Sequence, residues 1–273
     1  MSKSATRIIS YTLGAAETAT ACELLANRSG FSKGKIKDAM NKGAVWLVPP
    51  TGSMKRLRRA TAMLNPGEKI ELHYNEEVLA KQVPTGALVA DLHHYSVWFK
   101  PSGVLAQGTM EGDHCALLRQ AELHFKMLRP VFLVHRLDRE ASGLMLVAHS
   151  QNAAARLSAL FQNNAVFKRY WVQVRGQLIP AQGAIDTPLD GKSAHTEYTL
   201  ESYDPASDTS ILSVVIDTGR LHQIRRHLDG INHPVIGDPK YGTGNKSPAG
   251  LQLNAVQLRF RCPFTDKEMD FSV

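Results

Sequence analysis

The sequence contains few cysteines and no long apolar run, and both absences narrow the class of protein it encodes. Its three cysteines, Cys22, Cys115 and Cys262, are odd in number and far apart. They therefore provide neither a disulfide framework nor the paired spacing of a zinc knuckle. No apolar stretch is long enough to cross a bilayer, and the early run from Ile8 to Leu13 is short and interrupted by polar residues. We expect a cytoplasmic protein without membrane spans, in which the cysteines are reduced packing residues.

Acidic residues are scarce in one region, and this makes the charge distribution uneven. The 273 residues carry a formal net charge of +7. Between Phe31 and Thr61 there are eight cations and a single acid, Asp38, so this segment alone has the excess of the whole chain. The cations are Lys33, Lys35, Lys37, Lys42, Lys55, Arg56, Arg58 and Arg59. Clustered cations favour a polyanionic partner, because binding to phosphates releases counterions. A merely solvated basic face is the alternative.

The pattern around these cations predicts a small N-terminal module. Apolar spacing predicts a helix over 17–27, and a second helix that begins after the N-cap residue Ser32 and ends at Gly43. Strands are predicted over 44–48, 55–61 and 69–74, and the polar residues 75–84 are the expected linker. The order of elements from Ser32 to Tyr74 resembles the S4 RNA-binding domain. That resemblance implies an RNA-binding domain over residues 1–80, in which the eight cations contact RNA.

Residues 81–273 are expected to form a second, strand-rich domain. Strand-like runs occupy 89–99, 131–134, 144–148, 166–175, 196–203, 211–216 and 251–261. Helices are predicted over 152–162 and after Thr218. The combination predicts an α+β fold with a mixed, largely antiparallel sheet.

Charged residues that could take part in catalysis are concentrated in the segment from His135 to Leu144. Hydrophobic strands are predicted on both sides, so the segment is a loop held at its two ends, as a rigid site requires. Arg136 and Arg139 flank Asp138. Neighbouring cations would keep this carboxylate ionised and reactive at neutral pH. An ordinary loop of ion pairs would have the same composition.

This loop resembles the signature loop of the RluA-type pseudouridine synthases. Four further segments match that family in the same order: Lys100 to Gly103, Lys168 to Tyr170, Thr218 to Arg225, and His233 to Gly242. Together they extend from about residue 88 to the C-terminus. The resemblance implies the pseudouridine synthase fold and an enzyme that isomerises uridine in RNA without a metal or another cofactor.

The resemblance also implies roles for individual residues. Asp138 stands at the position of the family's catalytic aspartate, Arg225 at that of its partner arginine, and Tyr170 at that of the residue that stacks on uracil. Arg136 is expected to fill the gap that the extruded uridine leaves in the RNA. The other residues expected at the substrate are His135, Leu137, Arg139, Lys168, Arg220 and His222.

The segment after Thr218 is also predicted to be helical from its own pattern. Leu221, Ile224 and Leu228 have helical spacing, which places His222 and Arg225 together on another face. The chain departs from the family pattern at Leu221, where threonine or lysine is common, and at Ala141 in the signature loop, where threonine is usual. Neither departure removes a charged group.

Other functions remain open at this point. A metal-dependent hydrolase would need ligands from His135, Asp138, His222, His227 and His233, but their spacing matches no metal-binding motif. A non-catalytic RNA-binding or ribosome-assembly factor needs only the N-terminal module. For an enzyme, we expect a monomer that acts on structured RNA, with ribosomal RNA favoured over transfer RNA.

Overall fold

The computed structural model describes residues 5–15 and 17–273, which form two compact units. The first unit consists of the residues up to 83 together with residues 107–120. The second unit consists of residues 84–106 and 121–273. The sequence predicted one boundary, at residue 80, and gave no sign that residues 107–120 join the first unit. No helix in the described part of the chain is long and apolar enough to cross a membrane.

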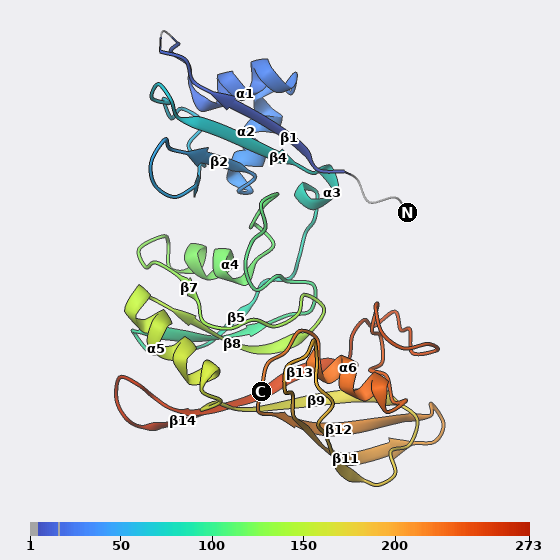
Figure 1. Ribbon diagram of the computed structural model, residues 1–273. Coiled ribbons are helices and arrows are strands. Elements are labelled where there is room, and N and C mark those ends of the chain that lie inside the picture. The colour runs from blue at the N-terminus through green and yellow to red at the C-terminus, as the bar shows by residue number, and fades with distance from the viewer. Residues whose placement is uncertain (1–4, 16) are drawn as a thin grey trace. The chain divides into compact units, whose positions relative to one another are not determined.

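The first unit contains a four-stranded sheet and three helices. Its elements are β1 (Arg7–Thr12), α1 (Ala21–Ser29), α2 (Lys33–Asn41), β2 (Val45–Val48), β3 (Lys55–Arg56), β4 (Lys69–Tyr74) and α3 (Glu76–Leu79). The strands are antiparallel in the order β1-β4-β2-β3. Figure 1 shows α1 and α2 on one face of this sheet, and residues such as Leu25 and Ile36 pack there against Ile70 in one core.

Local hydrogen bonds explain where α1 begins. Thr20 and Glu23 form a capping box, in which each side chain accepts from the backbone N–H of the other. The helix therefore starts at Ala21, and the predicted start at Glu17 is wrong. The Glu17 carboxylate instead accepts from the Gly14 N–H at 2.9 Å.

Three other features of the first unit differ from the predictions. Strand β1 was missed because it is a largely exposed edge strand without a clear apolar alternation. The predicted strand over 55–61 is only two residues long. The predicted linker over 75–84 contains α3, which Asn75 caps through its side chain.

The second unit is built around a ten-stranded sheet. The boundary between the two units, after residue 120, falls within helix α4. Its elements are β5 (Ala87–Asp91), β6 (Tyr95–Lys100), α4 (Leu117–His124), β7 (Phe132–Leu133), β8 (Ser142–Ala148), α5 (Gln151–Gln162), β9 (Phe167–Arg175), β10 (Gln182–Ile185), β11 (Thr196–Asp204), β12 (Thr209–Ile216), α6 (Gln223–Gly230), β13 (Leu253–Arg261) and β14 (Glu268–Ser272). The main order is β10-β11-β12-β9-β13-β8-β6-β5, with β14 on β13 and β7 on β8. Within it, β8 and β13 are parallel, and the other pairs are antiparallel. The predicted α+β class with a largely antiparallel sheet is confirmed.

Some strands of the second unit were predicted inaccurately. The single strand expected over 89–99 is a hairpin of β5 and β6, and its turn contains His93 with φ 65°. Strands β10 and β14 and helix α4 were missed. β10 is four residues long and has one buried apolar residue, Ile185, so its sequence lacks an apolar pattern. In β14 the half-buried Met269 and Phe271 do alternate with exposed polar residues, but the strand is only five residues long and was overlooked.

The sheet brings three distant segments to one place. The loop that contains Asp138 leads into β8, which is buried from Gly143 to Ala148. Gly143 has φ +123°, and a Cβ there would meet the Ala255 backbone at 2.4 Å. This close approach lets β8 pair with β13, while β9 on the other side of β13 carries Tyr170.

Candidate active site

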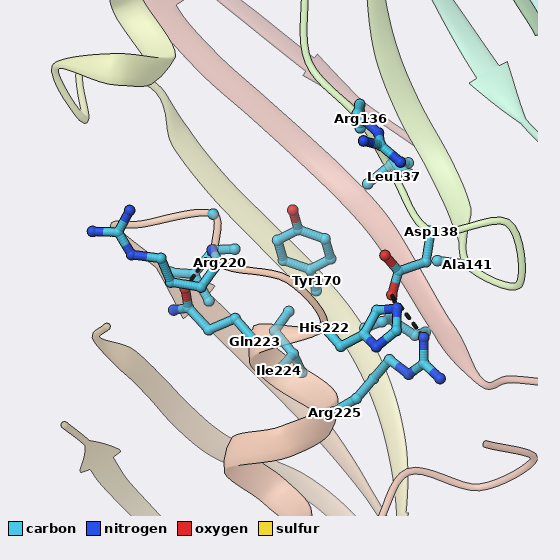
Figure 2. Close-up of a pocket in the computed structure, with 13 residues that line it drawn as sticks. Arg136, Leu137, Asp138, Ala141, Tyr170, Arg220, His222, Gln223, Ile224 and Arg225 are labelled. Atoms are coloured by element: carbon cyan, nitrogen blue, oxygen red, sulfur yellow. Dashed lines mark hydrogen bonds and ion pairs between the residues drawn. The ribbon is translucent and has the colours of Figure 1, made fainter. Parts of the chain in front are cut away.

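A cavity of about 90 Å³ opens where the Asp138 loop, β9 and the start of α6 meet (Figure 2). Seven of the residues predicted at the site line it. They are Arg136, Leu137, Asp138, Tyr170, Arg220, His222 and Arg225. The structure thus brings together segments that are separated by up to about 90 positions in the sequence, and an acid, an aromatic ring and several cations face the same small space.

Asp138 is held by one end of a buried ion network. Its Oδ2 accepts from Arg225 Nη1 at 2.9 Å. On its other side, Arg225 donates from Nε and Nη2 to the two carboxylate oxygens of Asp238 at 2.7 and 2.8 Å. Arg225 and Asp238 are 2% and 0% exposed, whereas the Asp138 side chain retains 23%. Asp238 therefore fixes the planar guanidinium of Arg225 on its buried side, and the guanidinium donates one hydrogen bond to the more exposed Asp138.

The charges of this network stabilise one another. Burial disfavours the charge of Arg225, but the hydrogen bonds to Asp238 and Asp138 outweigh this effect and raise its pKa. Burial also disfavours the Asp238 carboxylate, but Arg225 and the backbone N–H groups of Tyr241 and Lys240 lower its pKa. Asp238 lies in a segment, His233 to Gly242, that resembles the family, yet no role was predicted for it.

His222 lies beside the same carboxylate oxygen. Its Nε2 is 3.8 Å from Asp138 Oδ2, and its Nδ1 is 3.0 Å from the Tyr241 hydroxyl. Burial lowers the pKa of His222, and the nearby Asp138 carboxylate only partly opposes this effect. The residue has φ 54°, a left-handed conformation that non-glycine residues rarely adopt. This backbone directs the imidazole toward Asp138 one residue before α6 begins (Figure 2).

Gln223 holds the turn that precedes α6. Its Oε1 accepts from the Thr218 hydroxyl at 2.7 Å and from the Arg220 N–H at 3.0 Å. Its Nε2 donates to the carbonyl of His195 and the hydroxyl of Thr196. Gln223 is 3% exposed, so these bonds fix the turn from inside the protein. Gln223 lies in the segment from Thr218 to Arg225 that resembles the family, but its role depends on a turn that the sequence pattern does not predict.

Tyr170 presents its ring to the cavity from the centre of the sheet. It pairs with Val214 of β12 and Ala255 of β13. Burial and the neighbouring Asp138 charge raise the pKa of its hydroxyl. The group is therefore neutral near pH 7, which suits contact with an uncharged base.

Lys100 is a buried cation that fastens the Asp138 loop. It is fully buried, and its Nζ donates to the carbonyls of Ala141 at 2.6 Å, Val104 at 2.8 Å, Pro101 at 3.1 Å and Arg139 at 3.3 Å. Burial lowers the pKa of Lys100 to about 8, although the nearby Asp138 and Glu140 favour its charge. Lys100 lies in one of the segments that match the family, but it was not predicted to be a site residue.

The remaining predicted substrate residues have different locations. His135 and Lys168 line a second cavity of about 510 Å³ that adjoins the first. Arg139 lines neither cavity; its side chain pairs with Glu140 at 2.8 Å and is half exposed. Leu221 was expected on the packed face of a helix, but it precedes α6 and is 63% exposed. That expectation is wrong because the left-handed His222 interrupts the helical spacing.

The eight cations between Phe31 and Thr61, which were predicted to contact RNA, divide into three groups. Arg56 and Arg58 both pair with Asp113, and their side chains are only 17% and 23% exposed. Arg56 also donates to the Thr109 carbonyl, and its guanidinium lies over the ring of Trp46 at 4.2 Å. These two arginines thus bind residues 107–120 of their own unit.

The other six cations are at the surface or near it. Lys33, Lys35 and Lys42 pair with Glu23, Glu76 and Asp38. Lys37, Lys55 and Arg59 are exposed, and no ion pair joins them to another residue that the structure describes. They are the cations of this segment that are most readily available to an external anion.

Of the five residues considered for a metal-dependent hydrolase, Asp138 and His222 lie together, but the other three have separate partners. His135 stacks on Phe161, His227 contacts Thr196, and His233 contacts the Arg175 carbonyl. Among the described residues, no group of three His, Cys, Asp or Glu side chains is arranged to hold a metal ion.

Comparisons with known proteins show which family the chain resembles. Residues 94–229 match a family described as RNA pseudouridylate synthase. The chain is 31% identical over 241 residues to an uncharacterised RNA pseudouridine synthase of Aquifex aeolicus, with 80% of this chain and 74% of that protein covered. It is 29% identical to the dual-specificity RNA pseudouridine synthase RluA of Vibrio parahaemolyticus, with 66% and 79% covered. The solved structure of human RNA pseudouridylate synthase domain containing 4 is similar, with a TM-score of 0.58, 26% identity, and 68% of this chain and 87% of that chain covered.

Proposed function

The chain belongs to the RluA-type RNA pseudouridine synthase family and is an isomerase, and on this premise we propose that Asp138 converts an extruded uridine in structured RNA into pseudouridine. The observation that carries the proposal is the Asp138 carboxylate, held by the buried Arg225–Asp238 pair beside Tyr170 in a small cavity. Ribosomal RNA is the proposed substrate class, with transfer RNA as the alternative.

The reaction exchanges one bond to the sugar for another. The bond between uracil N1 and ribose C1′ breaks, the base turns, and a bond forms between C5 and C1′. The C5 proton leaves and N1 gains a proton, so no atom or electron is lost overall. Asp138 would act by adding to the sugar, by adding to the base, or by removing a sugar proton, and each role requires an ionised carboxylate.

The contacts of Asp138 suit this task. Both Arg225 and His222 approach Oδ2, and Figure 2 shows the other carboxylate oxygen on the side of Tyr170. Oδ1 is therefore the oxygen proposed to react. Arg225 would hold the carboxylate in place through Oδ2 while leaving this oxygen accessible.

Tyr170 and the size of the cavity support extrusion of the uridine. A base that remained stacked in RNA would not reach Asp138 in so small a space, and enzymes acting on a base commonly rotate it out of the stack. The ring of Tyr170 would then stack on the uracil while it turns. Arg136 lies at the rim, exposed, and is proposed to fill the gap in the RNA.

We further propose that the first unit is an S4-like module that binds RNA away from the reacting uridine. Its helix pair beside a small sheet and its exposed Lys37, Lys55 and Arg59 support this role. A separate binding module is suited to a large folded RNA, and this favours ribosomal RNA.

Mapping of pseudouridine provides the test, with Asp138→Asn as the critical variant. RNA from cells without the gene should lack at least one pseudouridine, and purified protein should restore it to ribosomal RNA. Asp138→Asn retains the shape of the side chain but loses its charge, so turnover should fall by at least about 10⁴-fold while RNA affinity stays within about threefold. Substantial turnover by this variant would reject the mechanism, and restoration only on transfer RNA would support the alternative substrate.

A further inference from the structure

The second cavity is larger than the reaction itself requires. It has a volume of about 510 Å³, compared with about 90 Å³ for the first cavity. Five residues line both cavities and form a shared wall: Arg136, Tyr170, Ile216, Gly219 and Arg220. Sites for small organic ligands usually measure about 300–1,000 Å³, so the first cavity has room for the reacting base but not for a whole nucleotide. The second cavity can hold the sugar and phosphate of the target and still has space for another group.

The charge of the second cavity suits a nucleic-acid strand. None of its fourteen lining residues, all of them described, is an aspartate or glutamate. Three are cations: Arg136, Lys168 and Arg220. Lys168 is buried and donates to the Asp217 carbonyl, and Arg220 Nε donates to the Ser193 carbonyl. Arg136 is exposed, and no hydrogen bond or ion pair joins it to another residue in the described part of the chain. A phosphate would therefore be favoured at the shared wall, where Arg136 lies.

One side of the second cavity is aromatic and uncharged. The rings of His135 and Phe161 are stacked, with centroids 4.2 Å apart and an angle of 18° between their planes. Burial and the nearby Lys168 charge lower the pKa of His135 to about 3, and its Nε2 accepts from the Leu146 N–H at 3.0 Å. The imidazole is thus neutral and fixed in orientation. Phe161 completes a rigid platform on which a nucleobase can stack.

The end of α5 adds polar groups that can recognise a base edge. Gln162 is the last residue of α5, and Asn164 follows the helix in a left-handed conformation. Both are exposed and line the cavity. The C-terminal end of a helix carries partial negative charge, so it disfavours a phosphate but accepts hydrogen bonds from base amino or imino groups. The phosphate and the base would therefore lie on opposite sides of the cavity.

We propose that the second cavity binds the base of the nucleotide adjacent to the target uridine in the same RNA strand. The adjoining phosphodiester passes Arg136 and Arg220, the base stacks beside Phe161, and its edge meets Gln162 and Asn164. The proposal rests on the proposed function, because it needs the target uridine in the first cavity. It would make Phe161 and Gln162 determinants of which uridines are modified.

The test uses stem-loop RNAs that contain the mapped uridine. One RNA is complete, one lacks the base on the 5′ side of the uridine, and one lacks the base on the 3′ side. Affinity is measured with protein that carries Asp138→Asn, so that the RNA is not converted. Loss of the relevant neighbouring base should weaken binding by about 10-fold, since base–aromatic stacking commonly contributes that much or more.

Variants of the cavity connect this loss to particular residues. Phe161→Leu keeps much of the packing volume but removes the ring, and Gln162→Ala changes an exposed side chain with little risk to folding. Each variant should weaken binding of the complete RNA by about 3- to 10-fold. For the RNA that lacks the relevant neighbouring base, each should weaken binding by less than about twofold, because the contact is already absent. Gln151→Ala makes the same change as Gln162→Ala at the other end of α5 and should leave all three affinities unchanged.

The outcomes separate this proposal from the proposed function. Equal weakening by Phe161→Leu and Gln162→Ala on all three RNAs would show that the cavity holds only the sugar and phosphate of the target, and would overturn the proposal. The proposal is also overturned if neither neighbouring base affects binding while the unmodified protein still forms pseudouridine. If the unmodified protein forms no pseudouridine in any RNA, the proposed function itself fails.

Discussion

At the scale of single residues, the ion network around Arg225 separates a reactive acid from a structural one. Asp138 and Asp238 contact the same guanidinium, but Asp238 is fully buried and also accepts from the N–H groups of Lys240 and Tyr241. Asp138 has one oxygen without these constraints and lies at the cavity. The two carboxylates therefore have different tasks, with Asp238 orienting Arg225 and Arg225 orienting Asp138.

Replacing Asp238 tests whether it acts on Asp138 through Arg225. In Asp238→Asn, an amide donor would face Arg225 Nε, and the guanidinium would shift from its place. We expect kcat to fall by about 100-fold with little change in KM, because misplacement by about 1 Å commonly has this effect. In the Arg225→Met background, the same change should cost less than about threefold and should raise the melting temperature, since it removes an unpaired buried charge. If the losses in kcat from Asp238→Asn and Arg225→Met simply multiply in the double variant, Asp238 does not act through Arg225.

The lowered pKa of Lys100 predicts that activity declines at alkaline pH. Its ammonium binds carbonyls on both sides of the Asp138 loop, and this proton is lost as the pH rises through about 8. Turnover should therefore be full below pH 8 and decline above it. Stability has the opposite sign: between about 8 and the ordinary value of 10.5, the unfolded chain binds the proton more tightly, so this group makes unfolding less favourable as pH rises.

The pH dependence of kcat at saturating RNA measures this effect. Lys100→Met should lower kcat at every pH and remove the decline near pH 8. Thermal unfolding at each pH provides the control, because a decline in kcat caused by unfolding would coincide with a fall in melting temperature. A decline that persists in Lys100→Met would assign it to another group.

At the scale of elements, the sequence predicted what depends on local pattern. The helix at α2 follows from the N-cap Ser32 and apolar spacing, and Ser32 does accept the expected backbone hydrogen bond. The helix at α5 was predicted without a cap, and the structure shows that Ser150 caps it. Strands with buried residues, such as β8 and β12, were also found. The edge strand β1 was missed because it is largely exposed. The five-residue strand β14 was missed although its polar and apolar residues alternate.

Roles that depend on contacts across the chain could not be inferred in this way. Asp138, Tyr170 and Arg225 line one cavity, and the sequence suggested that they act together only because their motifs resemble those of a family. Arg56 and Arg58 were predicted to bind RNA from their charge, yet the acid that pairs with them, Asp113, lies more than 50 positions away. Neither composition nor periodicity contains that information.

The attachment of residues 107–120 can be tested through Asp113. Asp113→Asn leaves two poorly exposed arginines without their acid, so opening of this segment should become easier by about 2–3 kcal/mol. Hydrogen exchange of the Thr109 and Asp113 amides, which donate to carbonyls in the folded unit, measures the change. Asp38→Asn removes an exposed partner of Lys42 and should cost at most about 0.5 kcal/mol. Equal, small effects of the two variants would show that the Asp113 pairs do not hold the segment.

At the scale of the whole molecule, the residues proposed for chemistry and those proposed for capture of RNA belong to different units. Asp138, Tyr170 and Arg225 lie in the second unit, and the exposed cations Lys37, Lys55 and Arg59 lie in the first. Binding energy from the first unit would be the same for the substrate and the transition state. It would therefore affect KM and leave the chemical step unchanged.

Neutralising the three exposed cations tests this division. If Lys37→Gln, Lys55→Gln and Arg59→Gln together remove three phosphate contacts, RNA affinity should fall, and the slope of log affinity against log salt should decrease by roughly 2 to 3. KM should rise, whereas kcat at saturating RNA should stay within about twofold. Lys267→Gln removes one exposed charge from the second unit and provides the control, because it should leave the slope unchanged. An unaltered slope in the triple variant would mean that these cations are only solvated and that the second unit captures RNA by itself.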